Sequence, residues 1–229
     1  PAPRARYVAP SRTRAEAALF YAAALGGPVE VLSERPLIVK LPNFASPAEC
    51  ASLRRRAVRA TRSTVVSVDD AKAENDYRTS RTRWLDDASV PPGLSERAAA
   101  IAELPLENAE KWQVAAYEPG AEYRLHTDTI PAFNELAPGG RHATVLLYLD
   151  APDAGGATVF PALGLAVAPE PGTAIYFRNA VEPVSDPFAM DPHPDAAHAG
   201  APVRAGAKTI ATKWFHPVPF PDGPDDGRS

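Results

Sequence analysis

The chain has 229 residues, a formal net charge of −4, and a composition that is 45% hydrophobic and 23% charged. This length and composition are ordinary for a soluble globular protein, so we expect one domain, residues 1–229, whose core needs no disulfide. The acidic balance supplies no overall basic field for nucleic acid, and no apolar run is long enough to span a bilayer. We therefore expect neither a nucleic-acid partner nor a membrane partner.

Three helices are expected in the first half of the chain. The alanine-rich stretch 13–25 predicts the first, which ends at a pair of glycines. Ser46, followed three residues later by Glu49, forms the capping-box pattern that begins the second helix. The third is expected over 95–104, after a proline pair, and the segment 36–41 predicts a short strand between the first two helices.

The character of the sequence changes after the second helix. Residues 63–68 suggest a strand, whereas residues 69–83 are too polar for a core. From Trp112 onward, short β-branched or aromatic runs alternate with proline and glycine turns. These runs are WQVAAY, EYRLHTD, ATVLLYLD, ATVF, LAVAP, GTAIYFRN and KTIATKWFHPV. Runs of this length and spacing indicate an antiparallel double sheet, so the sequence predicts a mainly β fold with flanking helices.

The segment His126-Thr127-Asp128 is a candidate metal motif. Residues i and i+2 of a strand point to the same side, so the imidazole and the carboxylate can converge on one point. Together they supply two ligands of a 2-His-1-carboxylate triad, which suits non-haem Fe(II) because it leaves coordination positions open.

A third ligand must come from another part of the chain, and His198 is the best candidate because it directly precedes a predicted strand. The competitors are His142, His193 and His216. His142 is equally consistent with a partly exposed strand histidine. His193 lies in a loop rich in proline and aspartate, where we expect exposure to solvent.

Lys208 follows His198 by ten residues and begins a segment that is otherwise apolar at alternate positions. A lysine that faces a core is costly unless an anion meets it, and the carboxylate of a cosubstrate would be such an anion. The alternative is a lysine on an edge strand that faces water.

Taken in order, the segments YEPG, HTD, RHATVLLYLD, GGATVFP and HAGAPVRAGAKTIATKWFH resemble the prolyl 4-hydroxylases, within the wider 2-oxoglutarate oxygenases. The resemblance covers roughly residues 29–220 and is densest after Lys111. It implies a double-stranded β-helix, a jelly-roll or cupin-like core over residues 111–220. Residues 1–110 would supply supporting helices and strands, together with a substrate lid at about 69–84.

The resemblance also implies roles for particular residues. The expected iron ligands are His126, Asp128 and His198. The residues expected at the 2-oxoglutarate are Lys208, Tyr117, Thr158 and Trp214. The residues expected to meet the substrate are Arg141, His216, Arg78 and Trp84. The last two lie in the stretch that resembles the lid of the family, although Arg81 and Thr82 depart from the family pattern.

The activity implied by the resemblance is that of a procollagen-proline 4-dioxygenase-like hydroxylase, which acts on a proline-rich peptide or protein. It would use Fe(II), 2-oxoglutarate and O2, with ascorbate as reductant. A hydroxylase of a free amino acid or of a small natural-product precursor is the alternative. A nucleic-acid oxygenase is disfavoured by the acidic balance, and a non-catalytic ligand-binding barrel by the complete ligand set.

The resemblance leaves two expectations open. Eukaryotic relatives imply the lumen of the ER or Golgi if a targeting segment has been removed, and bacterial relatives imply the cytoplasm. The oligomeric state is not predicted.

Overall fold

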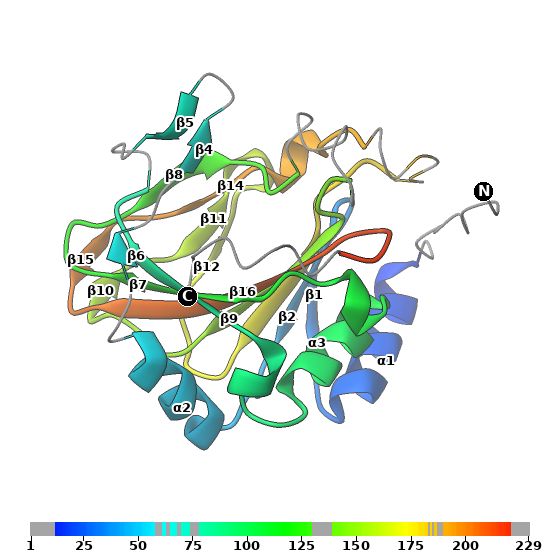
Figure 1. The fold of residues 1–229 in the computed structure, drawn as a ribbon. Coiled ribbons are helices and arrows are strands. Elements are labelled where there is room, and N and C mark those ends of the chain that lie inside the picture. Colours follow the sequence, from blue (N-terminus) through cyan, green and yellow to red (C-terminus); the bar gives the residue numbers. More distant parts are fainter. Residues whose placement is uncertain are drawn as a thin grey trace.

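The computed structural model describes residues 12–57, 61–62, 65–67, 70–73, 78–129, 139–182, 184, 186 and 190–220. Two layers of strands lie face to face, and helices cover the outer side of the larger layer (Figure 1). The helices are α1 (Arg14–Leu25), α2 (Pro47–Ala57) and α3 (Leu94–Ala102). Within these residues no helix is both long and apolar enough to cross a membrane.

The three predicted helices are confirmed, and capping interactions begin two of them, of which only the one at α2 was expected. At α2 the Glu49 carboxylate accepts from the Ser46 backbone N–H at 2.7 Å, while the Ser46 hydroxyl accepts from the Glu49 N–H at 3.2 Å. Thr13 caps α1 in the same reciprocal way. Gly26, which is left-handed with φ 73°, ends α1. Local sequence alone therefore determines where these helices begin and end.

The larger sheet has eight strands in the order β1-β2-β13-β9-β16-β7-β6-β3. Their bounds are β1 (Glu30–Glu34), β2 (Leu37–Leu41), β13 (Ala174–Arg178), β9 (Ala143–Tyr148), β16 (Lys208–Phe215), β7 (Trp112–Tyr117), β6 (Arg81–Leu85) and β3 (Thr61–Arg62). The smaller sheet, in the order β12-β11-β14-β8, has the bounds Leu165–Val167, Thr158–Phe160, His198–Gly200 and Tyr123–His126. Two strand pairs complete the fold: β10 (Ala154–Gly155) with β15 (Val203–Ala205), and β4 (Val65–Ser67) with β5 (Asp70–Ala73).

Alternation along the central strands divides the hydrophobic core into two layers. In β9, Val145 and Leu147 pack into the cluster that includes the helix residue Leu53. Their neighbours Leu146 and Tyr148 point the other way, into the cluster between the two sheets. Because both faces of the larger sheet are covered, its strands β9, β13 and β16 are buried along their whole length, and side chains of β9 and β16 line the pocket between the sheets. The fold is the predicted double-stranded β-helix with supporting helices.

Three strands of the larger sheet, β1, β3 and β6, were not predicted. β1 pairs with β2, and β6 lies at the end of the stretch that was expected to be a lid. The expectation that residues 69–83 stay outside the core is wrong at Arg78 and Ser80, which are buried. Pairing with β7 satisfies the backbone of β6, and this long-range contact outweighs the polar character of the segment.

A glycine turn before β11 gives a test of backbone geometry. Gly155 has φ 79°, and a Cβ there would lie 2.3 Å from the Pro202 carbonyl oxygen. Gly155→Ala should therefore cost about 1 kcal/mol for the left-handed backbone, and roughly 1–3 kcal/mol more for the collision. Gly164→Ala is the matched control, since Gly164 has φ 62° with open space around the added Cβ, so only the backbone cost applies. Urea unfolding midpoints measure both; equal losses would contradict the collision.

Candidate metal and cosubstrate site

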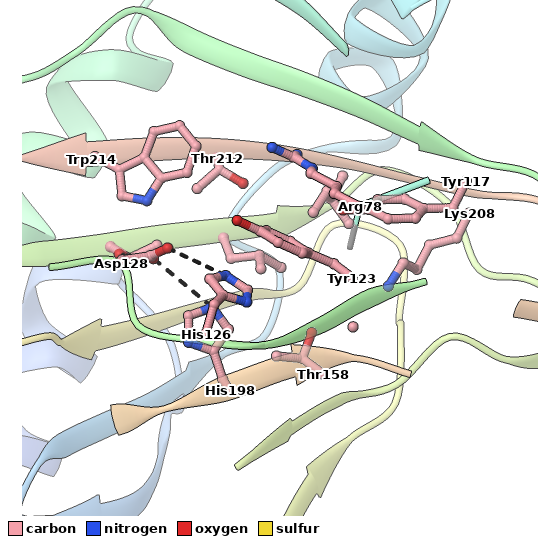
Figure 2. A pocket seen from close by; sticks show the side chains of 14 residues that line it. Arg78, Tyr117, Tyr123, His126, Asp128, Thr158, His198, Lys208, Thr212 and Trp214 are labelled. Atoms are coloured by element: carbon pink, nitrogen blue, oxygen red, sulfur yellow. Dashed lines mark hydrogen bonds and ion pairs between the residues drawn. The ribbon is translucent and has the colours of Figure 1, made fainter. Parts of the chain in front are cut away.

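Three side chains converge where β8 and β14 pair. His126 and His198 are direct cross-strand partners in this antiparallel pair. Asp128 lies just beyond the end of β8, so it reaches the histidines from a bend and not from the i, i+2 strand geometry that we expected. One ligand atom from each residue lies within 4.8 Å of the others. Figure 2 shows the Asp128 carboxylate beside the two rings, and its oxygens lie 3.5 Å from Nε2 of His126 and 3.9 Å from Nε2 of His198.

Backbone carbonyls orient both imidazoles. Nδ1 of His126 lies 2.8 Å from the Arg124 carbonyl oxygen, and Nδ1 of His198 lies 3.1 Å from that of Ala196. A carbonyl can only accept, so each Nδ1 carries the proton and each Nε2 presents a lone pair. That tautomer is the one a metal-bound histidine requires, and the second hydrogen bond fixes the plane of the ring.

The charges of the cluster also suit a cation. Burial alone would raise the pKa of Asp128, but the nearby His198 and His126 hold it well below its usual range. Burial, helped by the charge of His126, lowers the pKa of His198 to about 4. At neutral pH the group is therefore an ionised carboxylate beside a neutral His198 imidazole. This nitrogen and oxygen donor set fits Fe(II).

Lys208 lies in the same pocket as the three candidate ligands. It is 2% exposed and begins β16, a strand between β9 and β7, so the alternative of an edge-strand lysine in water is excluded. Its Nζ donates to the Gly156 carbonyl at 2.7 Å. Burial lowers the pKa of Lys208 to about 8, so an anion that entered the pocket would stabilise the charged form.

Tyr117 and Thr158 border the space around Lys208 (Figure 2). Tyr117 is the cross-strand partner of Lys208, and its ring centroid lies 4.8 Å from Nζ. The Thr158 hydroxyl lies 2.7 Å from the Tyr148 hydroxyl, which also lies 3.2 Å from the Val167 carbonyl oxygen. The two side chains are thus placed to meet an anion beside Lys208.

Trp214 lines the pocket on the side of the metal cluster, and its indole N–H is buried without a partner among the described residues. Trp84 does not line the pocket; its ring packs on Trp214 at 5.8 Å between centroids. Arg141 stacks on the same indole, with Cζ 3.9 Å from the ring centroid. Trp84 and Arg141, two of the four residues expected to meet substrate, therefore contact Trp214 but do not themselves line the pocket.

His216 also lies outside the pocket lining and is buried. Its Nε2 lies 3.1 Å from the Glu110 carboxylate, which also receives a two-point contact from Arg141. Burial would raise the pKa of Glu110, but Arg141 and His216 lower it to about 2. Arg141, Glu110 and His216 thus form an ionic cluster behind Trp214.

Arg78 lines the pocket, as expected for a residue near substrate. Its guanidinium donates to Gln113 at 2.6 Å and to Ser80 at 3.0 Å, and it lies 4.8 Å from the ring centroid of Tyr123. Tyr123 in turn stacks on His126, with 3.6 Å between ring centroids. Arg78 therefore connects the segment before β6 to the metal cluster through one aromatic ring.

The other candidate histidines do not join the cluster. His142 is fully buried, which corrects the reading of a partly exposed strand residue, and burial lowers its pKa to about 3. His193 is partly buried, and its Nδ1 accepts from the Asp195 N–H at the start of a short 3-10 helix. Neither side chain belongs to the group of ligand atoms around Asp128.

Sequence reasoning missed three residues around the ligands. Tyr123 stacks on His126, and the Thr144 hydroxyl donates to the Asp128 carboxylate at 2.7 Å. Asn179 in turn donates to that hydroxyl at 2.9 Å. Of these three residues, only Tyr123 lies close to a predicted ligand in the sequence, three residues before His126. Thr144 and Asn179 lie in apolar strand segments that read as core.

Comparisons with known proteins agree with this site. Residues 112–216 match the 2OG-Fe(II) oxygenase superfamily. Prolyl 4-hydroxylase subunit alpha-1 of Gallus gallus is 33% identical over 201 residues, which cover 83% of this chain. The match covers only 38% of that relative's length.

Solved structures extend the comparison. A prolyl hydroxylase from Trichoplax adhaerens, in complex with a hypoxia inducible factor peptide fragment, is 18% identical. The match has a TM-score of 0.55 and covers 78% of this chain and 83% of the Trichoplax chain, so the two proteins are alike in fold. The viral collagen prolyl hydroxylase from Paramecium Bursaria Chlorella virus-1, solved as a 2OG complex, is 30% identical with a TM-score of 0.58, and the match covers 79% of this chain and 96% of the viral one. Identity at this level over almost the whole viral enzyme shows that the chain belongs to the prolyl hydroxylases of the 2OG-Fe(II) oxygenase superfamily.

Proposed function

We propose that this chain is an Fe(II)- and 2-oxoglutarate-dependent dioxygenase that hydroxylates prolyl residues in a peptide or protein. The observation that carries the proposal is a single pocket lined by both His126, Asp128 and His198 and the buried Lys208. A keto acid with a second carboxylate can span such a pocket, with one end at the metal and the other at the ammonium group.

His126, Asp128 and His198 would hold the iron, since their free Nε2 atoms and ionised carboxylate are the donors that it prefers. When bound, Fe(II) with 2-oxoglutarate and O2 supplies the oxidising chemistry that hydroxylates a C–H bond and yields succinate and carbon dioxide. Ascorbate would keep the iron reduced. The protein itself supplies binding, orientation and a water-poor surrounding.

Lys208 would bind the distal carboxylate of 2-oxoglutarate, and the Thr158 hydroxyl, which lines the same pocket, would donate a hydrogen bond to it. The Tyr117 ring and the apolar side chains of Leu146 and Ile210 line the pocket with these groups. Apolar walls exclude water, which strengthens the contact between the ammonium group and the carboxylate.

The substrate would enter beside the metal, where Tyr123, Trp214 and Arg78 line the pocket. The indole N–H of Trp214, which has no partner among the described residues, would be a donor for a polar group of the substrate. The viral relative is a collagen prolyl hydroxylase, and the Trichoplax structure holds a peptide. These relatives support a peptide substrate, and we extend the proposal to a proline-rich one.

The test is succinate release from 2-oxoglutarate, with Fe(II) and ascorbate, in the presence and absence of a poly-proline peptide whose mass is followed. We expect the peptide to stimulate succinate release and to gain the mass of one oxygen atom on proline. Succinate that the peptide leaves unstimulated would favour a free amino acid or small-molecule substrate. Absence of succinate in all conditions would contradict the proposed activity.

A further inference from the structure

Asp128 is held by a buried hydrogen-bond chain that starts on two central strands of the larger sheet. Thr144 on β9 donates from Oγ1 to Asp128 Oδ2 at 2.7 Å, and Asn179, which directly follows β13, donates from Nδ2 to Thr144 Oγ1 at 2.9 Å. Thr144 and Asn179 are at most 1% exposed. Water therefore does not compete for these contacts, and each group depends on the next.

The direction of this chain follows from its chemistry. An ionised carboxylate only accepts, so the single hydroxyl proton of Thr144 must point to Asp128. The threonine oxygen can then only accept from its other neighbour, so Asn179 must present its NH2 group and not its carbonyl oxygen. The order of donors thus runs one way, from Asn179 through Thr144 to Asp128.

The two carboxylate oxygens of Asp128 differ in their contacts. Oδ2 accepts from Thr144 and lies 3.9 Å from Nε2 of His198, whereas Oδ1 lies 3.5 Å from Nε2 of His126. A carboxylate with one oxygen engaged in this way cannot turn freely about its Cβ–Cγ bond. Oδ1 remains as the oxygen that faces His126 without a competing donor among the described residues.

Asn179 also contacts the segment that leads to the other ligand. Its backbone N–H donates to the His142 carbonyl at 2.9 Å, and its carbonyl accepts from the His193 N–H at 2.8 Å. His193 precedes His198 by five residues. Asn179 therefore connects, through its side chain and its backbone, to the segments that carry Asp128 and His198.

We propose that Thr144 and Asn179 are positioning residues of the metal centre, which orient Asp128 so that Oδ1 alone ligates the metal. The inference rests on the metal site of the proposed function. Partners that only orient a ligand typically contribute 10-fold to 100-fold to metal affinity.

The test is Co(II) titration of the full chain without cosubstrate, followed by visible absorption, which reports both affinity and coordination geometry. Thr144→Val removes the hydroxyl and keeps the shape; we expect about 10-fold to 100-fold weaker Co(II) binding and an altered spectrum. Thr144→Ser restores the hydroxyl, and we expect it to recover both the affinity and the wild-type spectrum. Weak binding by Thr144→Ser would mean that the methyl group matters, and would overturn the proposal.

Asn179→Ala tests the second link of the chain. The loss of one neutral hydrogen bond predicts roughly twofold to tenfold weaker Co(II) binding. Valine at 144 offers no acceptor to Asn179, so Asn179→Ala should have no further effect in the Thr144→Val background. A full additional loss of Co(II) affinity in that background would show that Asn179 acts by another route, and would overturn the proposed hydrogen-bond chain.

Thr209→Val is the matched control. Its hydroxyl donates to the Asp150 carboxylate at 2.9 Å, so the substitution removes the same type of bond from a carboxylate outside the metal cluster. We expect wild-type Co(II) affinity in this variant; a loss as large as that of Thr144→Val would overturn the specific role. If the wild-type protein bound no Co(II), both the metal site and the role of Thr144 and Asn179 would be overturned. Tight Co(II) binding by Thr144→Val would overturn only the role of Thr144 and Asn179.

Discussion

His198→Ala is expected to abolish iron binding and turnover together. The substitution leaves two donors, His126 and Asp128, in a cluster whose three ligand atoms lie within 4.8 Å of one another. Loss of a residue that merely orients a ligand costs about 10-fold to 100-fold in affinity, so loss of the ligand itself should exceed about 100-fold. Fe(II) titration and succinate release measure the two effects.

His193→Ala is the control for this prediction. His193 was a candidate third ligand, but its Nδ1 accepts from the Asp195 N–H at 3.2 Å and it does not belong to the group of ligand atoms around Asp128. We expect wild-type iron affinity and succinate release. If His193→Ala lost iron and His198→Ala retained it, the third ligand would be wrongly assigned.

Lys208→Met is expected to raise the 2-oxoglutarate requirement steeply while leaving iron affinity intact. A hydrogen bond to a charged group in a buried site contributes about 1.5–3 kcal/mol, which corresponds to roughly 10-fold to 150-fold in the KM for 2-oxoglutarate. Methionine matches the length of the lysine stem, so the pocket keeps its shape. Separate measurements of iron affinity and of the KM for 2-oxoglutarate distinguish this role from a general loss of folding.

The pH dependence of cosubstrate binding gives an independent check of Lys208. Burial lowers its pKa to about 8, so the free pocket loses its positive charge as pH rises through about 8. The dianionic cosubstrate binds the charged form, so its affinity should be full below pH 8 and fall above it. Lys208→Met should bind weakly with little dependence on pH over this range. An unchanged slope in that variant would assign the titration to another group.

Local sequence was enough for most of the secondary structure. The capping box at Ser46 and Glu49 is present as predicted, and the apolar runs after Trp112 form the strands of both sheets. These signals are local because a cap depends on residues three positions apart and a strand on alternate residues. β6 was not predicted because its stability comes from pairing with β7, nearly thirty residues later.

The candidate site, like the secondary structure, was predicted in part from the sequence. The types and spacing of His126, Asp128, His198 and Lys208, read with the family resemblance, predicted the residues that the structure brings into one pocket. The predicted strand geometry for Asp128 was wrong, because β8 ends at His126 and the carboxylate turns inward from the following bend. A sequence motif identifies the side chains of a site, but the path of the backbone between them depends on what the segment packs against.

By itself, the sequence determined the mainly β class, the helix ends, and the side chains of the candidate metal and cosubstrate site. Only the tertiary structure decided that Lys208 is buried on a central strand and that His216 lies in an ionic cluster behind Trp214. The support of Asp128 by Thr144 and Asn179 was likewise decided there. These features join residues tens of positions apart, and their energies depend on burial and direction, which no local pattern along the chain encodes.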